Sequence, residues 1–328
     1  MKKISFIFPC ALAFLAALCG CGGEKTSGDL TPVTLNEVAH SIFYAPQYAA
    51  IELGYFEEEG IDLTLVNGAG ADKVMTSLIS GDADIGFMGS EASIYVWQEG
   101  SEDYAVNFAQ LTQRAGNFLV GRTEEPGFTW QDLKGKTVLG GRAGGMPQMV
   151  FEYILRKNGI DPAADLTIDQ SIDFGLTAAA FTSSDADYTV EFEPFATALE
   201  QEGSGHVVAS LGVDSGYVPY TAYSAKKSYL EEHPQIIQSF TNAIQKGLLY
   251  VNSHSAEEIA ETIRPQFPET DEASIAAIVE RYKEQDTWKN DAIFREDSFL
   301  LLQNILEQSG ELKRRAPYEE LVTTEFAE

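Results

Sequence analysis

Residues 60–88 read GIDLTLVNGAGADKVMTSLISGDADIGFM and alternate between two kinds of pattern. The runs at 61–66 and 85–88 are short and mostly apolar, which is typical of buried strands. The segment between them, 72–80, carries apolar residues at the spacing of one helical face: Val74, Met75, Leu78 and Ile79. A strand, a helix and a strand in this order predict a parallel pair of strands joined by a right-handed crossover.

The same order continues on both sides of this unit. A strand is expected at 33–39 and a helix at 47–54, so the first part of the chain reads strand, helix, strand, helix, strand. The second part repeats that order, with strands at 136–140, 166–169 and 188–192 and helices at 149–157 and 175–182. The alternation predicts an α/β fold with mostly parallel sheets.

Two short sequence echoes fall at matching points of the two parts. Gly60-Ile61-Asp62 follows the first helix of one part, and Gly159-Ile160-Asp161 follows the first helix of the other. Asp82-Ala83-Asp84 and Asp185-Ala186-Asp187 follow the second helices in the same way. We therefore predict two similar lobes, each built on its own sheet.

The extended segments at 118–122 and 217–224 are the candidate crossings between these lobes. One lobe is then expected to comprise 31–118 and 225–328, and the other 119–220. The C-terminal region reads as helical, with helices at 235–251, 272–283 and 298–309 and another that starts at the capping box Ser255-Ala256-Glu257-Glu258.

The composition excludes some classes of partner. The chain has 328 residues, of which 44% are apolar, so it is long enough for about two domains with a core each. Its 50 acidic and 22 basic residues give a net charge of −28, which repels phosphate backbones and anionic lipid headgroups. We expect no nucleic-acid partner. Zinc-binding and serine-hydrolase motifs are also absent from the sequence, although this absence does not exclude catalysis by Asp, Glu or Tyr. We expect no metal, no cofactor and no enzyme activity.

The N-terminus reads as an export signal. Lys2 and Lys3 precede an almost unbroken apolar stretch, 4–18, which is too short for a comfortable membrane span of about 20 residues. An ordinary secretory signal and a tilted membrane anchor are the alternatives to the more specific interpretation that follows.

The end of this stretch, Leu18-Cys19-Gly20-Cys21, resembles the bacterial lipobox. The resemblance implies removal of a signal peptide, 1–20, and lipidation of Cys21, with 21–30 as a tether. All three cysteines of the chain lie at or before Cys21, so the mature domain is predicted to contain no disulfide and no thiol nucleophile.

The segment 40–60, HSIFYAPQYAAIELGYFEEEG, resembles the opening of bacterial solute-binding proteins of the nitrate/sulfonate/taurine transporter class. It is also similar to binders of thiamine-pyrimidine precursors. Further shared phrases are LISGDADIG at 78–86, LKGKT at 133–137 and Glu193-Pro194. The resemblance covers essentially everything after the tether. It implies a type II periplasmic-binding-protein fold, in which two α/β lobes joined by a hinge trap a ligand in the cleft.

The resemblance also implies a location and partners. The protein is expected outside the cytoplasmic membrane, attached through its N-terminal lipid only, as a monomer. It would deliver a small-molecule ligand to an ABC importer permease and its ATPase. Two other classes stay open at this point: an enzyme, since the fungal thiamine-pyrimidine synthase is a catalytic relative of this fold, and a ligand-sensing module that needs a separate receptor.

Candidate binding residues come from the loops beyond the carboxyl ends of the expected strands, where ligands of parallel α/β sheets bind. Those in the loops and near the crossings are His40, Tyr44, Ser90, Glu91, Gln113, Arg142, Gly144, Gly145, Met146, Asp173, Glu191, Glu193 and Tyr220. The loop 141–146 enters a helix whose free N–H groups can hold electron-rich ligand atoms, and Arg142 adds a forked donor. The same loop also fits a plain glycine turn with a solvated arginine.

The charges of these candidates indicate a class of ligand. The candidates include one basic residue, Arg142, and four acidic residues: Glu91, Asp173, Glu191 and Glu193. Burying an anion beside unpaired carboxylates is costly, whereas an amino-substituted ring can donate hydrogen bonds to them. We therefore expect a small nitrogen-containing organic ligand, with a thiamine-pyrimidine precursor as the example. Taurine and other sulfonates, and nitrate, are the alternatives in the same role.

Overall fold

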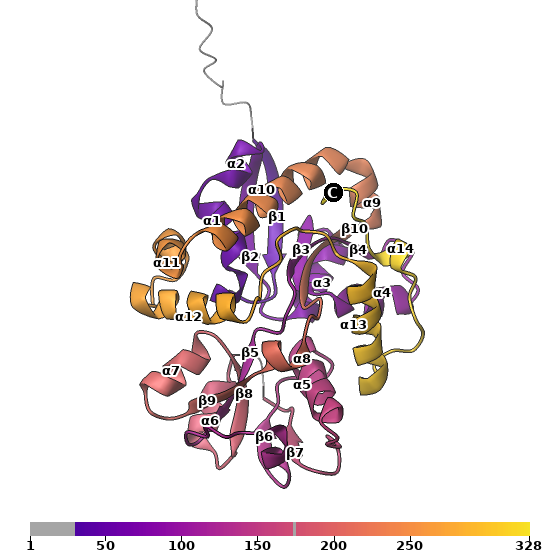
Figure 1. Cartoon of the computed structure of the whole chain (residues 1–328). Helices are drawn as coiled ribbons and strands as arrows, with labels where there is room; N and C mark the ends of the chain where they lie inside the picture. Colours follow the sequence, from indigo (N-terminus) through magenta and orange to yellow (C-terminus); the bar gives the residue numbers. More distant parts are fainter. Residues whose placement is uncertain (1–29, 173–174) are drawn as a thin grey trace, which may run out of the picture.

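The computed structural model describes residues 30–172 and 175–328, which form two five-stranded sheets, one in each lobe (Figure 1). The first sheet has the strand order β2-β1-β3-β10-β4 and the second β7-β6-β8-β5-β9. The strands are β1 (Thr31–Glu37), β2 (Ile61–Asn67), β3 (Ile85–Gly89), β4 (Ala105–Thr112), β5 (Asn117–Gly121), β6 (Thr137–Leu139), β7 (Thr167–Asp169), β8 (Tyr188–Phe192), β9 (His206–Ser210) and β10 (Thr221–Lys226).

Helices pack around both sheets and between the lobes (Figure 1). The α-helices are α1 (Ala45–Glu52), α2 (Tyr55–Glu58), α3 (Ala71–Ser80), α4 (Glu91–Gln98), α5 (Met146–Lys157), α6 (Thr177–Ser183), α7 (Phe195–Gln201), α8 (Leu211–Ser215), α9 (Lys227–Glu232), α10 (Pro234–Ser253), α11 (Ala256–Ile263), α12 (Glu272–Glu284), α13 (Glu296–Ser309) and α14 (Tyr318–Leu321). Three 3-10 helices complete the set: η1 (Ile42–Tyr44), η2 (Trp130–Leu133) and η3 (Arg264–Gln266).

The two sheets are built alike, as the sequence predicts, but they are mixed instead of mostly parallel. In each sheet three neighbouring strands are parallel, and the fourth position is held by an antiparallel strand, β10 in the first sheet and β5 in the second. Both antiparallel strands come directly after a passage of the chain from one lobe to the other. The crossing itself therefore supplies the strand that breaks the parallel pattern.

The repeated Asp-Ala-Asp sequence has a structural explanation. Asp84 accepts a hydrogen bond from the backbone N–H of Thr34 at 2.8 Å, and Asp187 accepts one from Thr137 at 2.9 Å. Thr34 and Thr137 lie in β1 and β6, which hold the same second position in the strand orders of the two sheets. The echo therefore marks one backbone contact that each lobe repeats.

The passages between lobes lie at 113–116 and 211–220, close to the expected segments but not identical to them. The expected crossing at 118–122 mostly falls within β5, which pairs with β8 and β9 of the second sheet. Much of the expected crossing at 217–224 lies in β10 of the first sheet. The backbone N–H and C=O groups of a buried extended segment need hydrogen-bond partners, and neighbouring strands supply them. Both expected crossings therefore continue into strands of the sheets.

The C-terminal helices belong mainly to the first lobe. Helix α10 packs on α1, and the approach is close at Gly247, where a Cβ atom would lie 2.1 Å from the carbonyl oxygen of Pro46. The predicted capping box is confirmed, because Ser255 and Glu258 each accept from the other's backbone N–H at the start of α11. Helix α12 reaches the second lobe, where Arg281 pairs with Glu193 at 2.6 Å.

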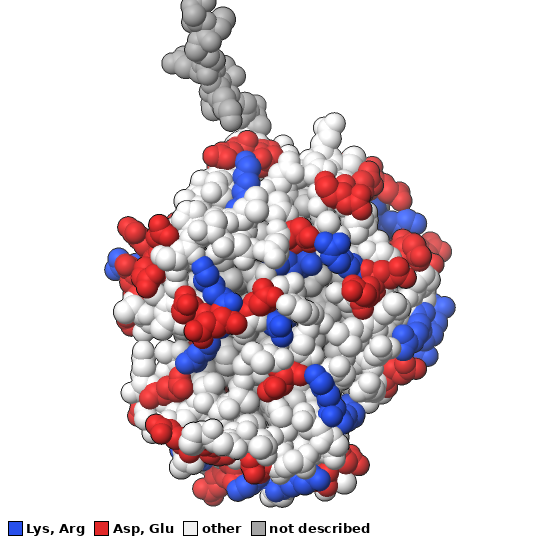
Figure 2. All heavy atoms as spheres, viewed as in Figure 1, with Lys and Arg blue, Asp and Glu red and all other residues white. Residues whose placement is uncertain are grey.

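Acidic and basic side chains are interspersed on the face seen in Figure 2, where acidic groups lie beside the basic ones over both lobes. On this face, among the described residues, no basic cluster stands apart from acidic side chains. Within 30–172 and 175–328, no helix is both long enough and apolar enough to cross a membrane. The signal peptide, Cys21 and nearly all of the tether lie outside the described residues.

Candidate functional site

A cavity of about 660 Å³ lies between the two lobes. Its wall is formed by residues at or just beyond the carboxyl ends of β1, β2 and β3 in the first lobe and of β6, β7 and β8 in the second. From the first lobe and the return crossing come Val38, Ala69, Gly70, Ala71, Asp72, Lys73, Gly89, Glu91, Tyr220 and Thr221. From the second come Asn117, Gly141, Arg142, Gly145, Met146, Pro147, Gly175, Leu176, Thr177, Val190, Glu191, Phe192 and Phe195. The cavity thus lies where ligands of parallel strands bind.

Glu91 begins helix α4 directly after β3, and only 2% of its surface is exposed. Its carboxyl group lies over Gly89, where a Cβ atom would be 2.2 Å from Oε2, so glycine leaves the space that the carboxyl occupies. Within the described part of the chain, Oε2 accepts no hydrogen bond. Burial raises the pKa of Glu91 to about 7, although the nearby N–H groups of Glu91 and Met146 and the charge of Arg142 act in the opposite direction.

Glu191 lies in β8 on the opposite lobe and is buried to the same extent. Its two carboxyl oxygens accept hydrogen bonds from the hydroxyls of Thr189, at 2.6 Å, and Thr177, at 2.9 Å. Burial raises its pKa to about 7 as well, against the opposing effect of these two hydroxyls. The cavity therefore holds one buried carboxyl group from each lobe.

Arg142 and Asp72 form an ion pair that joins the lobes beside the cavity, with 2.9 Å between Nη1 and Oδ1. Both side chains are about half exposed, at 47% and 57%. Partial burial acts to raise the pKa of Asp72, but the hydrogen bond and charge of Arg142 hold it below its usual value. A second link between the lobes runs from the hydroxyl of Tyr95 to the carbonyl oxygen of Gly144, at 3.1 Å.

The rest of the wall is largely apolar. Tyr220 is buried, and its hydroxyl donates to Oδ1 of Asn117 at 2.6 Å. Leu176, Phe192 and Phe195 contribute apolar side chains, and Leu176 and Phe195 remain exposed. Such a site can hold a small organic molecule with an apolar body and a polar end.

The structure brings six of the thirteen sequence candidates to the cavity wall: Glu91, Arg142, Gly145, Met146, Glu191 and Tyr220. Asp173 lies outside the described residues, as does the lipidation candidate Cys21. The other six candidates lie elsewhere.

Two of these six, His40 and Tyr44, are held within the first lobe. The ring nitrogens of His40 lie 2.7 Å from Glu37 Oε1 and 2.8 Å from the carbonyl oxygen of Gln266. Tyr44 is buried, and its ring forms a T-shaped contact with that of Phe87. Neither side chain lines the cavity, although Tyr44 lies near Glu91 of the wall.

Ser90 and Glu193 also have protein partners. The Ser90 hydroxyl donates to the carbonyl oxygen of Pro219. Glu193 accepts from Arg281 and, at 2.9 Å, from the backbone N–H of Thr197, so it links α12 to the second lobe. Burial raises the pKa of Glu193, while Arg281 acts to lower it. The family phrase Glu193-Pro194 therefore marks a contact between the lobes in this structure.

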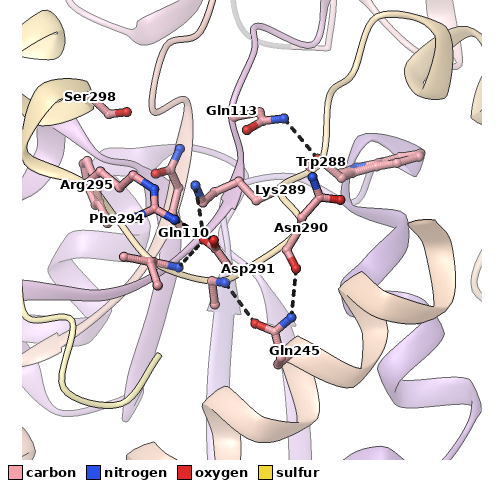
Figure 3. Close-up of polar contacts among 12 residues, drawn as sticks. Gln110, Gln113, Gln245, Trp288, Lys289, Asn290, Asp291, Phe294, Arg295 and Ser298 are labelled. Atoms are coloured by element: carbon pink, nitrogen blue, oxygen red, sulfur yellow. Dashed lines mark hydrogen bonds and ion pairs between the residues drawn. The ribbon is translucent and has the colours of Figure 1, made fainter. Parts of the chain in front are cut away.

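Gln113 and Gly144 complete the set. Gln113 lies in the first crossing and donates to the carbonyl oxygens of Asp286 and Trp288, each at 3.2 Å. Figure 3 shows the contact with Trp288. Gly144 donates its N–H to Gln148 at 3.0 Å and accepts from Tyr95 through its carbonyl. Both hold loops in place without lining the cavity.

Figure 3 shows a polar group next to Gln113, centred on Lys289 and Asp291. Lys289 is buried, lies 3.5 Å from Asp291, and has a pKa lowered by burial. None of the residues labelled there lines the cavity.

Several wall residues were missed from the sequence. Asp72 and Lys73 follow β2. Ligands bind beyond the carboxyl ends of parallel strands, and this rule, which selected Asp173 in the equivalent loop of the second lobe, applies to both residues too. Thr177 begins α6 after β7, so the same rule applies to it, whereas Asn117 had no such signal because it begins β5 directly after the first crossing. Within 30–172 and 175–328, no group of three or more His, Asp or Glu residues could hold a metal ion.

The chain is similar to known proteins in both sequence and structure. A family model described as "NMT1/THI5 like" matches residues 42–258, more than half of the chain. YtlA of Bacillus subtilis (strain 168), a protein named for a binding role, is 46% identical over 326 residues, which cover 99% of this chain and 97% of YtlA.

Two solved structures share the fold at low identity. The alkanesulfonate-binding protein SsuA from Xanthomonas axonopodis pv. citri, bound to MOPS, has a TM-score of 0.72 at 15% identity and matches 90% of this chain and 99% of its own. The desulfurization enzyme DSZB has a TM-score of 0.61 at 14% identity, with 90% and 97% covered. This fold therefore carries both a binding protein and an enzyme, and the fold alone does not choose between them.

Proposed function

The chain belongs to the NMT1/THI5-like family, and from this premise we propose that it is the solute-binding protein of an ABC importer. It captures a small organic, nitrogen-containing molecule between its lobes and delivers it to the permease. The identity of 46% to YtlA, a protein named for binding, supports a binding role over the enzyme that the fold also accommodates.

The observation that carries this proposal is the cavity between the lobes, with one buried carboxyl group from each side. Glu91 and Glu191 are acceptors that a ligand can reach only from inside the cleft. A ligand that satisfies both joins the two lobes. Closure is then favoured by the contacts that the ligand makes only in the closed state. A transporter can recognise this closed conformation and so distinguish the loaded protein from the empty one.

The ligand class follows from the polar groups of the wall. Amino groups and ring N–H groups donate to carboxylates, and the apolar side chains of Phe192 and Phe195 suit the faces of a small ring. A thiamine-pyrimidine precursor is an example of such a molecule. A bare oxyanion such as nitrate carries no hydrogen-bond donor for Oε2 of Glu91, and it would lie beside like charge wherever these carboxyl groups are ionised.

An aminosulfonate such as taurine is the second candidate, favoured by one observation. Lys73 and Arg142 are cationic and line the same cavity as the two glutamates. A molecule with an amine at one end and a sulfonate at the other could use both sets of groups. Arg142 would then have to leave Asp72, its partner in the present structure.

The proposed location of the protein is inferred from the leader sequence. Leu18-Cys19-Gly20-Cys21 supports export and attachment through a lipid on Cys21, with the binding lobes outside the cytoplasmic membrane. That position suits the capture of external solutes for an importer. The monomeric state is part of the same proposal.

Thermal-shift screening of the domain spanning 22–328 tests the proposal. The panel contains pyrimidines, other vitamins, sulfonates and oxyanions. A ligand at about 100 times its dissociation constant adds about 2.7 kcal/mol to the free energy of unfolding. A ligand that stabilises the protein and reduces its radius of gyration in solution scattering supports a hinged trap. Turnover of a compound from the panel, with no closure, would support an enzyme instead.

A further inference from the structure

In the part of the chain that the structure describes, the buried part of the cavity wall contains two acidic side chains and no basic one. Arg142 is paired with Asp72 and is half exposed, and Lys73 is exposed. Glu91 and Glu191 are each 2% exposed, and within the described residues neither forms an ion pair with a cation. Two acidic groups are thus withdrawn from water while the two cations of the wall stay near the solvent.

The immediate partners of these two carboxyl groups do not supply the missing charge. Glu191 is satisfied by two neutral threonine hydroxyls. Glu91 has one oxygen that accepts no hydrogen bond from the described residues, and the closeness of Gly89 shows that the chain keeps room for this carboxyl. A buried carboxylate without a cation is costly, so an empty cavity favours the protonated acids.

We propose that the ligand carries a positively charged, amidine-like nitrogen head that binds between Glu91 and Glu191 and joins the two lobes. This inference rests on the proposed function and narrows its ligand to a cation. An amidinium group places two N–H donors side by side, which matches the two oxygens of a carboxylate and forms short charge-assisted hydrogen bonds. The apolar body of the ligand then lies against Leu176, Phe192 and Phe195.

Binding of such a cation depends on pH. The charged and titratable groups that face Glu91 are Arg142 across the cleft and three tyrosines, Tyr44, Tyr95 and Tyr220. Burial raises the pKa of each of these tyrosines, so they stay neutral. Because burial raises the pKa of both glutamates to about 7, the cation must displace protons in acid, and its affinity falls as the pH drops below about 7.

Three planar probes of nearly the same shape test the charge: benzamidine is a cation, benzamide is neutral and benzoate is an anion. Calorimetry on the full chain should show benzamidine binding about 10-fold to 100-fold more tightly than benzamide, with benzoate weakest. Glu91→Gln and Glu191→Gln should each weaken benzamidine binding by about tenfold and leave benzamide unchanged. Glu280→Gln, an exposed change on α12, is the matched control and should alter neither.

Equal binding of benzamidine and benzamide, stronger binding of benzoate, or no binding of any probe would overturn the inference. So would benzamidine binding that the two glutamine variants leave unchanged. These outcomes differ from failure of the proposed function. A sulfonate without an amine that closes the cleft in the thermal-shift screen would keep the transport role and refute the cationic ligand.

Discussion

Replacing Glu91 by glutamine should make the ligand-free protein more stable above neutral pH. The change keeps the size and shape of the side chain and removes its ability to ionise. Glu91 is buried, and its pKa is raised by burial from 4.5 to about 7. In the unfolded chain the same group ionises at its ordinary value, so the folded state holds a proton that the unfolded state has already released.

The sign and the size of the effect follow from this difference. Below about pH 4.5 both states carry the proton, and Glu91 costs nothing through ionisation. As the pH rises from about 4.5 to about 7, the wild type loses stability relative to the glutamine variant. Above about pH 7 the full difference is present, and it amounts to about 3 kcal/mol.

Urea denaturation of both proteins at several pH values from about 4.5 to about 8 measures this difference. The gap between the wild type and Glu91→Gln should widen steadily with pH, while Glu280→Gln, whose side chain is exposed, should follow the wild type. Parallel curves for the wild type and Glu91→Gln would refute the reasoning. A gap that widens towards acid would show that Glu91 is held as a carboxylate.

Other changes test the contacts between the lobes and the anchor. Arg142→Gln and Asp72→Asn should show a coupling of about 0.2–1 kcal/mol in a double-mutant cycle, lost at high salt, because the pair is half exposed; additive effects would show that the pair contributes nothing. Glu193→Gln should lower the free energy of unfolding by about 1–3 kcal/mol, because it removes a buried charge partner of Arg281, and unchanged denaturation would contradict this. Cys21→Ser should release the protein from the membrane fraction or stall its processing; unchanged fractionation and unchanged mass would contradict the lipid anchor.

Local patterns in the sequence predicted most of the elements. The strand expected at 188–192 matches β8 residue for residue, and the helix expected at 272–283 matches α12 to within one residue. Both segments have periodic apolar residues and clear ends, which are local signals. The antiparallel strands β5 and β10 could not be placed in their sheets in the same way, because their neighbours are set by partners distant in the chain.

The site shows the same limit. Glu91 and Glu191 were predicted as binding residues because they lie at the carboxyl ends of expected strands, and both line the cavity. The family phrase also pointed to Glu193, but its carboxylate is taken by Arg281, which lies 88 residues further along the chain. No local pattern reports such a pairing, so sequence reasoning could not separate a carboxylate that lines the cavity from one that holds the lobes together.

The central claim is that the two buried carboxyl groups bind a nitrogen-containing ligand in the cleft. Calorimetric titration of the wild type and of the double variant Glu91→Gln/Glu191→Gln with hydroxymethylpyrimidine, benzamidine, taurine and nitrate tests it most directly. We expect a nitrogen base to bind the wild type with one site per chain and to lose nearly all affinity for the double variant. Binding of nitrate or a sulfonate alone, with equal affinity for both proteins, would contradict the account.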